Sequence, residues 1–175
     1  TRGSFSLNDC LAKGPCLLNQ LLGILLRFRQ DRFAFIGDIR KMFHSIDIPI
    51  QDQMTHLFLW RDINQEKNPD TYAMTAVNMG DKPASAIAQT ALKMTAEDAA
   101  EKYPDVSKII LSNSYMDDIP ASLDSKKRGM KVMSEIEAVL DKRGFKMKNW
   151  TFSGQISKRE KSVDQAAVQA LLRKY

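Results

Sequence analysis

The sequence has few of the features that mark secreted, membrane-spanning or disulfide-stabilised proteins. It contains only two cysteines, and Cys10 and Cys16 are six positions apart, so a disulfide between them would close too small a loop to stabilise the fold. We therefore expect reduced thiols and an intracellular protein. The Leu-rich stretch Leu17–Leu26 is interrupted by Asn19 and Gln20 and is shorter than the ~20 apolar residues that a bilayer span needs. These features predict a protein without a transmembrane helix.

A secretion signal is also missing, because no basic start is followed by an apolar block and a small-residue cleavage site. The first residue is Thr rather than Met, from which we expect a segment of a longer chain. The 175 residues are 43% hydrophobic and 27% charged, which excludes a disordered chain and suffices for one core. The net charge of +5 favours a polyanionic partner such as nucleic acid, although a mildly basic solvated surface gives the same balance.

Hydrophobic periodicity predicts an alternation of helices and strands. Apolar residues at helical spacing predict a buried first helix, Asp81 is expected to cap the second, and Gly144 to end the third. The predicted helices span Pro15–Arg29, Asp81–Lys102, Ser125–Arg143 and Ser162–Tyr175. Short apolar runs predict strands over Phe33–Gly37, Leu57–Trp60, Tyr72–Val77, Lys108–Tyr115, Ile119–Leu123 and Phe145–Trp150.

The order of these elements predicts an α+β fold. When the strand pair between Leu57 and Val77 is set aside as an insertion, the order becomes strand, helix, strand, strand, helix, strand, which is the ferredoxin-like βαββαβ arrangement. Its first and third strands are antiparallel neighbours at the centre of the sheet. The end of the first strand should therefore lie beside the tight turn that opens the third, so we expect Asp38 to meet Asp117 and Asp118.

Three converging carboxylates point to a metal site. Such groups repel one another and raise each other's pKa unless a cation lies among them. Mg²⁺ binds oxygen ligands and keeps positions for water and phosphate, and two Mg²⁺ ions can promote in-line phosphoryl transfer. A simpler interpretation stays open at this point, in which Asp117 and Asp118 serve turn chemistry and Asp38 caps a helix.

Several segments carry a family resemblance. Tyr115-Met116-Asp117-Asp118 resembles the catalytic Y-x-D-D box of reverse transcriptases, and Phe35–Phe43 resembles their first-aspartate motif. Other stretches resemble the BEL/Pao group of long-terminal-repeat retrotransposons, namely SLNDCLAKGP from Ser6, LLGILLRFR from Leu21, HLFLWR from His56, NMGDKPASAIA from Asn78 and GFKMKNW from Gly144. Together these segments span about Ser6 to Gly154.

The resemblance implies an RNA-directed DNA polymerase domain with the ferredoxin-like polymerase palm, an inserted strand pair and an N-terminal fingers helix. It divides the chain into a partial fingers region (1–32), the palm (33–154) and a C-terminal helical extension without a recognisable thumb (155–175). The implied partners are an RNA or DNA template with primer, deoxynucleoside triphosphates, and the fingers, thumb, ribonuclease H and integrase of a polyprotein, with no membrane. The implied location is a cytoplasmic particle, the nucleus or both.

The resemblance also assigns roles residue by residue. Asp38, Asp117 and Asp118 take the catalytic positions, where Asp38 and Asp117 would bind two Mg²⁺ ions, the Ile39 carbonyl would add a ligand and Asp118 would complete the acidic cluster. Phe43 matches a bulky gate that excludes a ribose 2′-hydroxyl. Lys148, with Lys146 as the weaker match, falls where a lysine is proposed to protonate pyrophosphate. The implied substrate-binding residues are Ile39, Phe43, Gly80, Asp81, Lys82, Tyr115, Met116 and Lys148.

Some of these assignments have competing explanations. Phe43 would also suit ordinary core packing, Lys148 would suit a solvent-facing edge position, and His44 and His56 lack metal-ligand spacing and suit structural roles. Two other functions stay open, a non-catalytic nucleic-acid or protein-binding module and a two-metal nuclease, which would need no sugar gate. Because fingers and thumb are incomplete, we expect the isolated chain to be inactive.

Overall fold

A computed structural model describes residues 5–154 of the protein, and the C-terminal helix predicted over Ser162–Tyr175 lies outside these residues. The helices are α1 (Leu7–Cys10), α2 (Leu21–Phe28), the 3₁₀ turn η1 (Phe43–Ser45), α3 (Ile50–Gln53), α4 (Ala84–Asp98), α5 (Pro104–Asn113) and α6 (Lys126–Asp141). The strands are β1 (Phe33–Arg40), β2 (Leu57–Trp60), β3 (Asp70–Ala73), β4 (Asp118–Leu123), β5 (Lys146–Met147) and β6 (Thr151–Phe152). The fold is therefore a mixture of helices and antiparallel sheet, as the sequence predicted.

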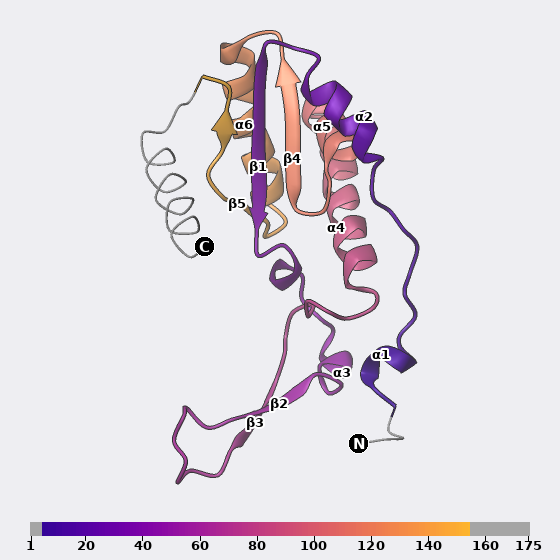
Figure 1. Ribbon diagram of the computed structural model, residues 1–175, viewed down its shortest axis with the longest axis vertical. Helices are drawn as coiled ribbons and strands as arrows, with labels where there is room; N and C mark the ends of the chain where they lie inside the picture. Colours follow the sequence, from indigo (N-terminus) through magenta and orange to yellow (C-terminus); the bar gives the residue numbers. More distant parts are fainter. Residues whose placement is uncertain (1–4, 155–175) are drawn as a thin grey trace, which may run out of the picture.

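Strand β1 lies at the centre of the main sheet (Figure 1). It pairs antiparallel with β4 over a register that runs from Phe33 opposite Leu123 to Asp38 opposite Asp118. On its other side β1 pairs with β5 and then with β6. The prediction that the first strand is an antiparallel neighbour of the strand over Ile119–Leu123 is confirmed.

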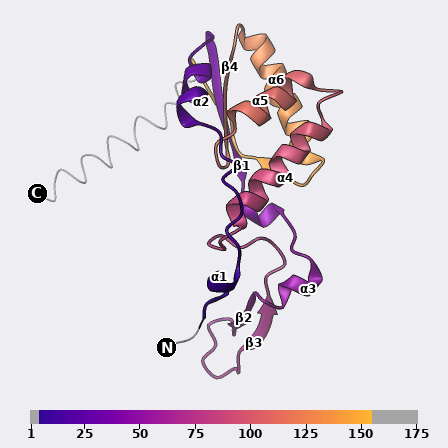
Figure 2. The same cartoon turned by 90° about the vertical axis from the view of Figure 1, so that its right-hand side faces the viewer.

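Helices α4, α5 and α6 cover one face of this sheet (Figure 2). Residues alternate along β1, so that Phe33, Phe35, Gly37 and Ile39 are buried toward the helices, while the residues between them are partly exposed on the opposite face. The core against which they pack includes Leu92 of α4, Ile110 of α5 and Ile136 of α6. Asp38 consequently lies on the face that the helices leave open.

The glycine in α6 fits the close approach of this helix to the sheet. A β-carbon at Gly129 would lie 2.2 Å from Phe33 Cδ1, whereas one at Gly23 in α2 would meet only the end of the Arg27 side chain at 3.3 Å. We expect Gly129→Ala to destabilise the chain by about 1–3 kcal/mol through overpacking. Gly23→Ala should stabilise it by up to about 1 kcal/mol, since Ala is the better helix former. Urea unfolding of both variants tests this, and a stable Gly129→Ala variant would contradict the packing argument.

The strand predicted over Lys108–Tyr115 is wrong, because this segment belongs to helix α5. The apolar run at its centre suits either element, but burial follows helical spacing through Val106, Ile110 and Asn113. Pro104 opens α5 as its first residue. In the described part of the chain, the second strand of the βαββαβ arrangement is therefore missing and the predicted hairpin shrinks to one bridge between Tyr115 and Asp118.

Other boundaries differ from the prediction. Helix α2 begins at Leu21 rather than Pro15, and it is not buried as predicted: Ile24 is its one buried residue, while Leu22 and Leu26 are exposed. It packs beside β4 and α5 instead of under the sheet, so only one side of the helix is covered. The strand over Phe145–Trp150 divides into β5 and β6, and the strand over Tyr72–Val77 shifts to β3.

The inserted strand pair forms a separate two-stranded sheet, β2 and β3, which projects away from the body (Figure 1). All four residues of β2, Leu57–Trp60, are exposed. Cys10 and Cys16 are both free and exposed, which confirms the expectation of unpaired thiols. Among the helices in residues 5–154, none is long and apolar enough to cross a membrane.

Candidate active site

Strands β1 and β4 bring the predicted aspartates together. Asp38 is the direct cross-strand partner of Asp118, so both side chains project from the same, open face of the sheet. Asp117 joins them through the backbone, because the Ile39 N–H donates to the Asp117 carbonyl at 2.7 Å. The predicted meeting of these three residues is therefore confirmed at the level of the backbone.

The turn that carries Asp117 is tight and strained. Tyr115 and Asp118 exchange two backbone hydrogen bonds of 2.9 and 3.0 Å across Met116 and Asp117. Met116 has a φ of +54°, a conformation that tight hairpin turns require but that is costly for a residue other than glycine. The buried side chain of Gln89, on α4, donates a hydrogen bond of 3.0 Å to the Met116 carbonyl. This contact stabilises the strained peptide from the helical layer.

Lys148 approaches Asp38 from the other side of β1. The Lys148 N–H donates to the Asp38 carbonyl at 2.8 Å, and its Nζ lies 2.7 Å from Asp38 Oδ1. Asp38 Oδ1 is itself buried, and the Lys148 ammonium is the positive charge that faces it. Lys146 instead pairs with Asp141, which leaves Lys148 as the lysine of this site.

Charge crowding perturbs the site. Burial raises the pKa of Asp118 above 3.8, and the negative charges of Asp117 and Asp38 raise it further, while Lys148 opposes them. The pKa of Lys148 is raised above 10.5, first by its direct contact with Asp38 and then by the charges of all three aspartates. The negative charge of the three carboxylates therefore exceeds the positive charge that Lys148 supplies.

The raised pKa of Asp118 makes stability depend on pH. A folded-state pKa above the unfolded value of 3.8 means that the favourable protonated form is fully present below pH 3.8 and is lost as the pH rises through the folded value. Asp118→Asn should thus be more stable than the wild type at pH 7, by less than about 1 kcal/mol because solvent screens this group. The difference in Tm should vanish below pH 3.8, while Glu101→Gln, at an exposed acid, should show no such trend. A constant difference from pH 3 to 7 would contradict the electrostatic origin.

Phe43 lies just after β1, in the 3₁₀ turn η1. Its ring is half-buried and packs against the core, next to the fully buried Met42. The structure thus places Phe43 near the acidic cluster along the chain and also gives it a packing role.

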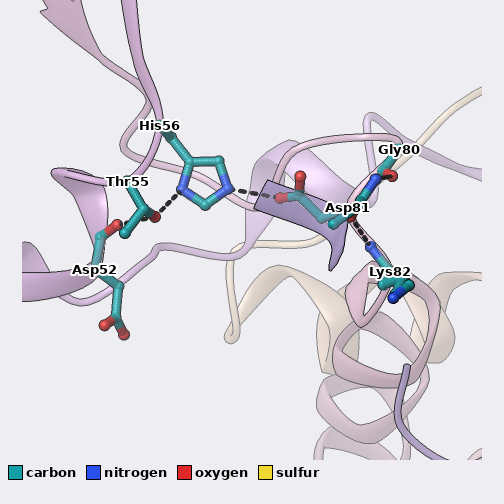
Figure 3. A network of polar contacts seen from close by, with 7 residues as sticks. Asp52, Thr55, His56, Gly80, Asp81 and Lys82 are labelled. Atoms are coloured by element: carbon teal, nitrogen blue, oxygen red, sulfur yellow. Dashed lines mark hydrogen bonds and ion pairs between the residues drawn. The ribbon is translucent and has the colours of Figure 1, made fainter. Parts of the chain in front are cut away.

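The loop of Gly80, Asp81 and Lys82 precedes α4 and forms a second group of predicted residues (Figure 3). Gly80 has a φ of +114°, which requires glycine, and a β-carbon there would meet no atom within 4 Å. Asp81 does not cap α4 as predicted, because Pro83 occupies that position and the Asp81 carboxylate binds His56 Nε2 at 2.8 Å.

Comparison with known proteins identifies the family. Residues 11–150 match the model of the reverse transcriptase (RNA-dependent DNA polymerase) family. The chain belongs to the reverse transcriptase family. A solved structure of the foamy viral protease-reverse transcriptase in complex with an RNA/DNA hybrid aligns with 74% of this chain at a TM-score of 0.55 and 18% identity. At this identity the likeness shows the fold alone, and this chain spans 15% of the length of that one. No curated protein matches the chain.

Family membership explains why a metal is expected among these carboxylates. Across residues 5–154, no three His, Cys, Asp or Glu side chains gather closely enough to hold a metal ion. The donor chemistry nevertheless fits a cation, because the buried Asp38 Oδ1 already attracts an ammonium at 2.7 Å, and burial and the neighbouring carboxylates raise the pKa of Asp118. Lys148 at present supplies the positive charge that these groups attract.

In this reverse transcriptase family member, sequence reasoning missed three side chains that support the site. The sequence predicts no role for Asn8 or Gln89 and only a structural role for His56. No local pattern could have found them, since Asn8 contacts residues 72 and 74 positions away and Gln89 contacts a residue 27 positions away. Gln89 also links the two groups of site residues, because α4 begins directly after the Gly80 loop and contacts the turn of Met116.

Proposed function

We propose that this chain is the palm with part of the fingers of a BEL/Pao-like reverse transcriptase, which adds deoxynucleotides to a primer 3′ end. The observation that carries the proposal is the β1–β4 register, which sets Asp38 beside Asp118 and the Asp117 backbone. Family membership and the open face of the sheet support it. Residues 1–32 would belong to the fingers, 33–154 to the palm, and 155–175 to a C-terminal extension.

The residues take the following roles in this proposal. Asp38, Asp117, Asp118 and the Ile39 carbonyl would hold two Mg²⁺ ions. When bound, these ions would activate the primer hydroxyl and stabilise the leaving pyrophosphate. Lys148, whose Nζ lies 2.7 Å from Asp38 Oδ1, would protonate the leaving pyrophosphate. Phe43 would exclude a 2′-hydroxyl, Tyr115 and Met116 would shape the floor of the site, and Gly80, Asp81 and Lys82 would form the template-side loop.

The proposed partners follow from this reaction. They are an RNA or DNA template with its primer, deoxynucleoside triphosphates and the remaining domains of a polyprotein, and the net charge of +5 suits a nucleic-acid ligand. We place the protein in a cytoplasmic particle, the nucleus or both.

A second candidate is a non-catalytic nucleic-acid or protein-binding module. The ion pair between Lys148 and Asp38 favours it, because the ammonium occupies the carboxylate that a metal would need. Mg²⁺ distinguishes the two functions. In a polymerase site, millimolar Mg²⁺ should displace Lys148 from Asp38 and raise the Tm, and Asp117→Asn should remove this rise. In a binding module, Mg²⁺ should give no rise in Tm that depends on Asp117.

We expect the 175-residue chain alone to extend primers negligibly, since it spans only 15% of the solved relative. A longer chain that restores fingers and thumb should polymerise in the presence of Mg²⁺. The measurement is incorporation of deoxynucleotides on a primed RNA template by both proteins. Robust extension by the short chain would show that the missing regions are dispensable, and an inactive longer chain that is folded would overturn the proposed function.

A further inference from the structure

The loop of Gly80, Asp81 and Lys82 is held by two side chains from distant segments. Figure 3 shows the contact made by His56. Asn8 of α1 contacts its first and third residues, and His56, which immediately precedes β2, contacts its second. Two local backbone hydrogen bonds close the loop, from the Asp81 N–H to the Asn78 carbonyl at 3.3 Å and from the Ala84 N–H to the Asp81 carbonyl at 3.0 Å. Asn8 and His56 add the contacts that tie it to distant segments of the chain.

Asn8 uses both ends of its amide on the loop backbone. Its Nδ2 donates to the Gly80 carbonyl at 2.9 Å, and its Oδ1 accepts from the Lys82 N–H at 2.8 Å. Helix α1 that presents Asn8 is itself braced, because the backbone N–H and hydroxyl of Ser6 both donate to Asp9 at 2.8 Å. These hydrogen bonds lower the pKa of Asp9, and the charge of Lys82 lowers it further, which draws the same loop toward α1.

His56 holds Asp81 in a largely shielded network. The side chains of His56 and Asp81 are only 11% and 13% exposed, and they line an apolar pocket of about 270 Å³ with Leu11, Val77 and Ile87. The Asp81 carboxylate accepts a hydrogen bond from His56 Nε2 at 2.8 Å, and Thr55 Oγ1 lies 2.9 Å from His56 Nδ1. Thr55 donates its one proton to the Asp52 carbonyl at 2.7 Å.

The donors and acceptors around His56 indicate how many protons its ring carries. Since the Thr55 hydroxyl is already a donor to Asp52, its oxygen can only accept from His56 Nδ1, and the Asp81 carboxylate can only accept from Nε2. All three contacts exist together only when both ring nitrogens carry protons. Asp47 and Asp52 are the other titratable groups that line this pocket.

We propose that Asn8 and a doubly protonated His56 are positioning residues that hold the Gly80–Lys82 backbone ready to receive the template and incoming nucleotide. This inference rests on the proposed function. It reassigns Asp81 from a substrate contact to an anchor, because its carboxylate is engaged by His56. The substrate would instead meet the loop at Gly80, where the space above the α-carbon is open.

Amide hydrogen exchange in the 175-residue chain tests the clamp without any activity. Asn8 Oδ1 is the acceptor of the Lys82 N–H, so Asn8→Ala should speed exchange at Lys82 by about 3- to 10-fold. Asn8→Asp keeps an acceptor for Lys82 but loses the donor to Gly80, and should retain protection at Lys82. Asn64→Ala is the matched control, because this asparagine accepts a hydrogen bond from the Glu66 backbone far from the loop. Equal exchange at Lys82 in the wild type and Asn8→Ala would overturn the clamp.

The ring of His56 gives a second readout. Nitrogen NMR at pH 6 should show two protonated ring nitrogens, and His56→Leu should loosen Asp81 and Lys82 while His56→Gln, which can still donate to Asp81, restores them in part. His44→Leu, at an exposed histidine, should leave the loop unchanged. A single protonated nitrogen in a folded chain would overturn the proposed state of His56.

Activity then separates the clamp from the proposed function. In a longer chain with fingers and thumb, Asn8→Ala and His56→Leu should raise the KM for dTTP on a poly(rA)/oligo(dT) template several-fold and change kcat less. An unchanged KM alongside faster loop exchange would overturn the positioning role. A wild-type longer chain without polymerase activity would overturn the proposed function, whereas the exchange result would still report on the clamp.

Discussion

Asp117→Asn in a longer chain that restores fingers and thumb should lower primer extension on the order of 100-fold or more. The substitution removes one negative charge next to Asp118, and with it an anionic oxygen of the kind that a divalent cation prefers. Steady-state incorporation of deoxynucleotides on a primed RNA template measures the loss.

The fold offers a way to separate chemistry from stability in this experiment. Asp117 is joined to β1 through its backbone carbonyl, which asparagine retains, so Tm should change little. The matched control is Asp124→Asn, at an exposed acid just after β4 that contacts Arg128 at 3.7 Å and lies outside the cluster. Full activity of Asp117→Asn would refute the metal assignment, and equal losses in both variants would indicate a general electrostatic effect.

The second large effect concerns sugar selectivity at Phe43. If its ring lies under the deoxyribose, Phe43→Ala and Phe43→Val in the longer chain should admit a ribonucleotide 2′-hydroxyl. Discrimination of this kind depends on a steric clash, so removing the clash relaxes selectivity without a new favourable contact. The ratio of deoxynucleotide to ribonucleotide incorporation efficiency should fall by at least about tenfold, which corresponds to about 1.4 kcal/mol, while deoxynucleotide turnover falls less.

A packing role for Phe43 predicts a different pattern. Phe→Ala costs about 3–5 kcal/mol at a buried site, and Phe43 is half-buried against the core, so we expect the lower end of that range. Phe152→Ala is a suitable control, because Phe152 is also half-buried against this core, with its ring centroid 5.6 Å from that of Phe33. An unchanged selectivity ratio with a large drop in the unfolding midpoint would assign Phe43 to the core alone.

The central contact of the candidate site was predictable because it follows from topology. An Asp at the end of one strand and an Asp pair before another become neighbours whenever these strands pair antiparallel, and the observed register places Asp38 opposite Asp118. The segment around Asp38 and the Tyr115–Asp118 turn were also predictable, because their own residue types indicate a strand end and a tight turn. Family membership confirms the resemblance to reverse transcriptases, while its BEL/Pao assignment stays a prediction.

Helix α5 shows where local pattern was insufficient. Ile109, Ile110 and Leu111 form an apolar run that favours a strand, and only packing beside α4 and β4 selects the helix in which Val106 and Ile110 face the core. The exposed leucines of α2 misled in the same way, since their spacing is helical but a single face of the helix meets the protein. The spacing of apolar residues indicates which side chains share one face of a helix, but it does not indicate which part of the protein packs against that face.

Local chemistry thus sufficed for the mixed fold, the free cysteines and the acidic turn, because short-range periodicity, short loops and turn preferences determine them. The order of the elements along the chain predicted the central strand pair. Tertiary packing alone set the contacts of Asn8, His56 and Gln89. These three side chains contact backbone or carboxylate groups that lie far away along the chain. Hydrogen bonds and ion pairs over such separations need the packed core to bring the segments together. These contacts therefore could not be predicted from the sequence alone.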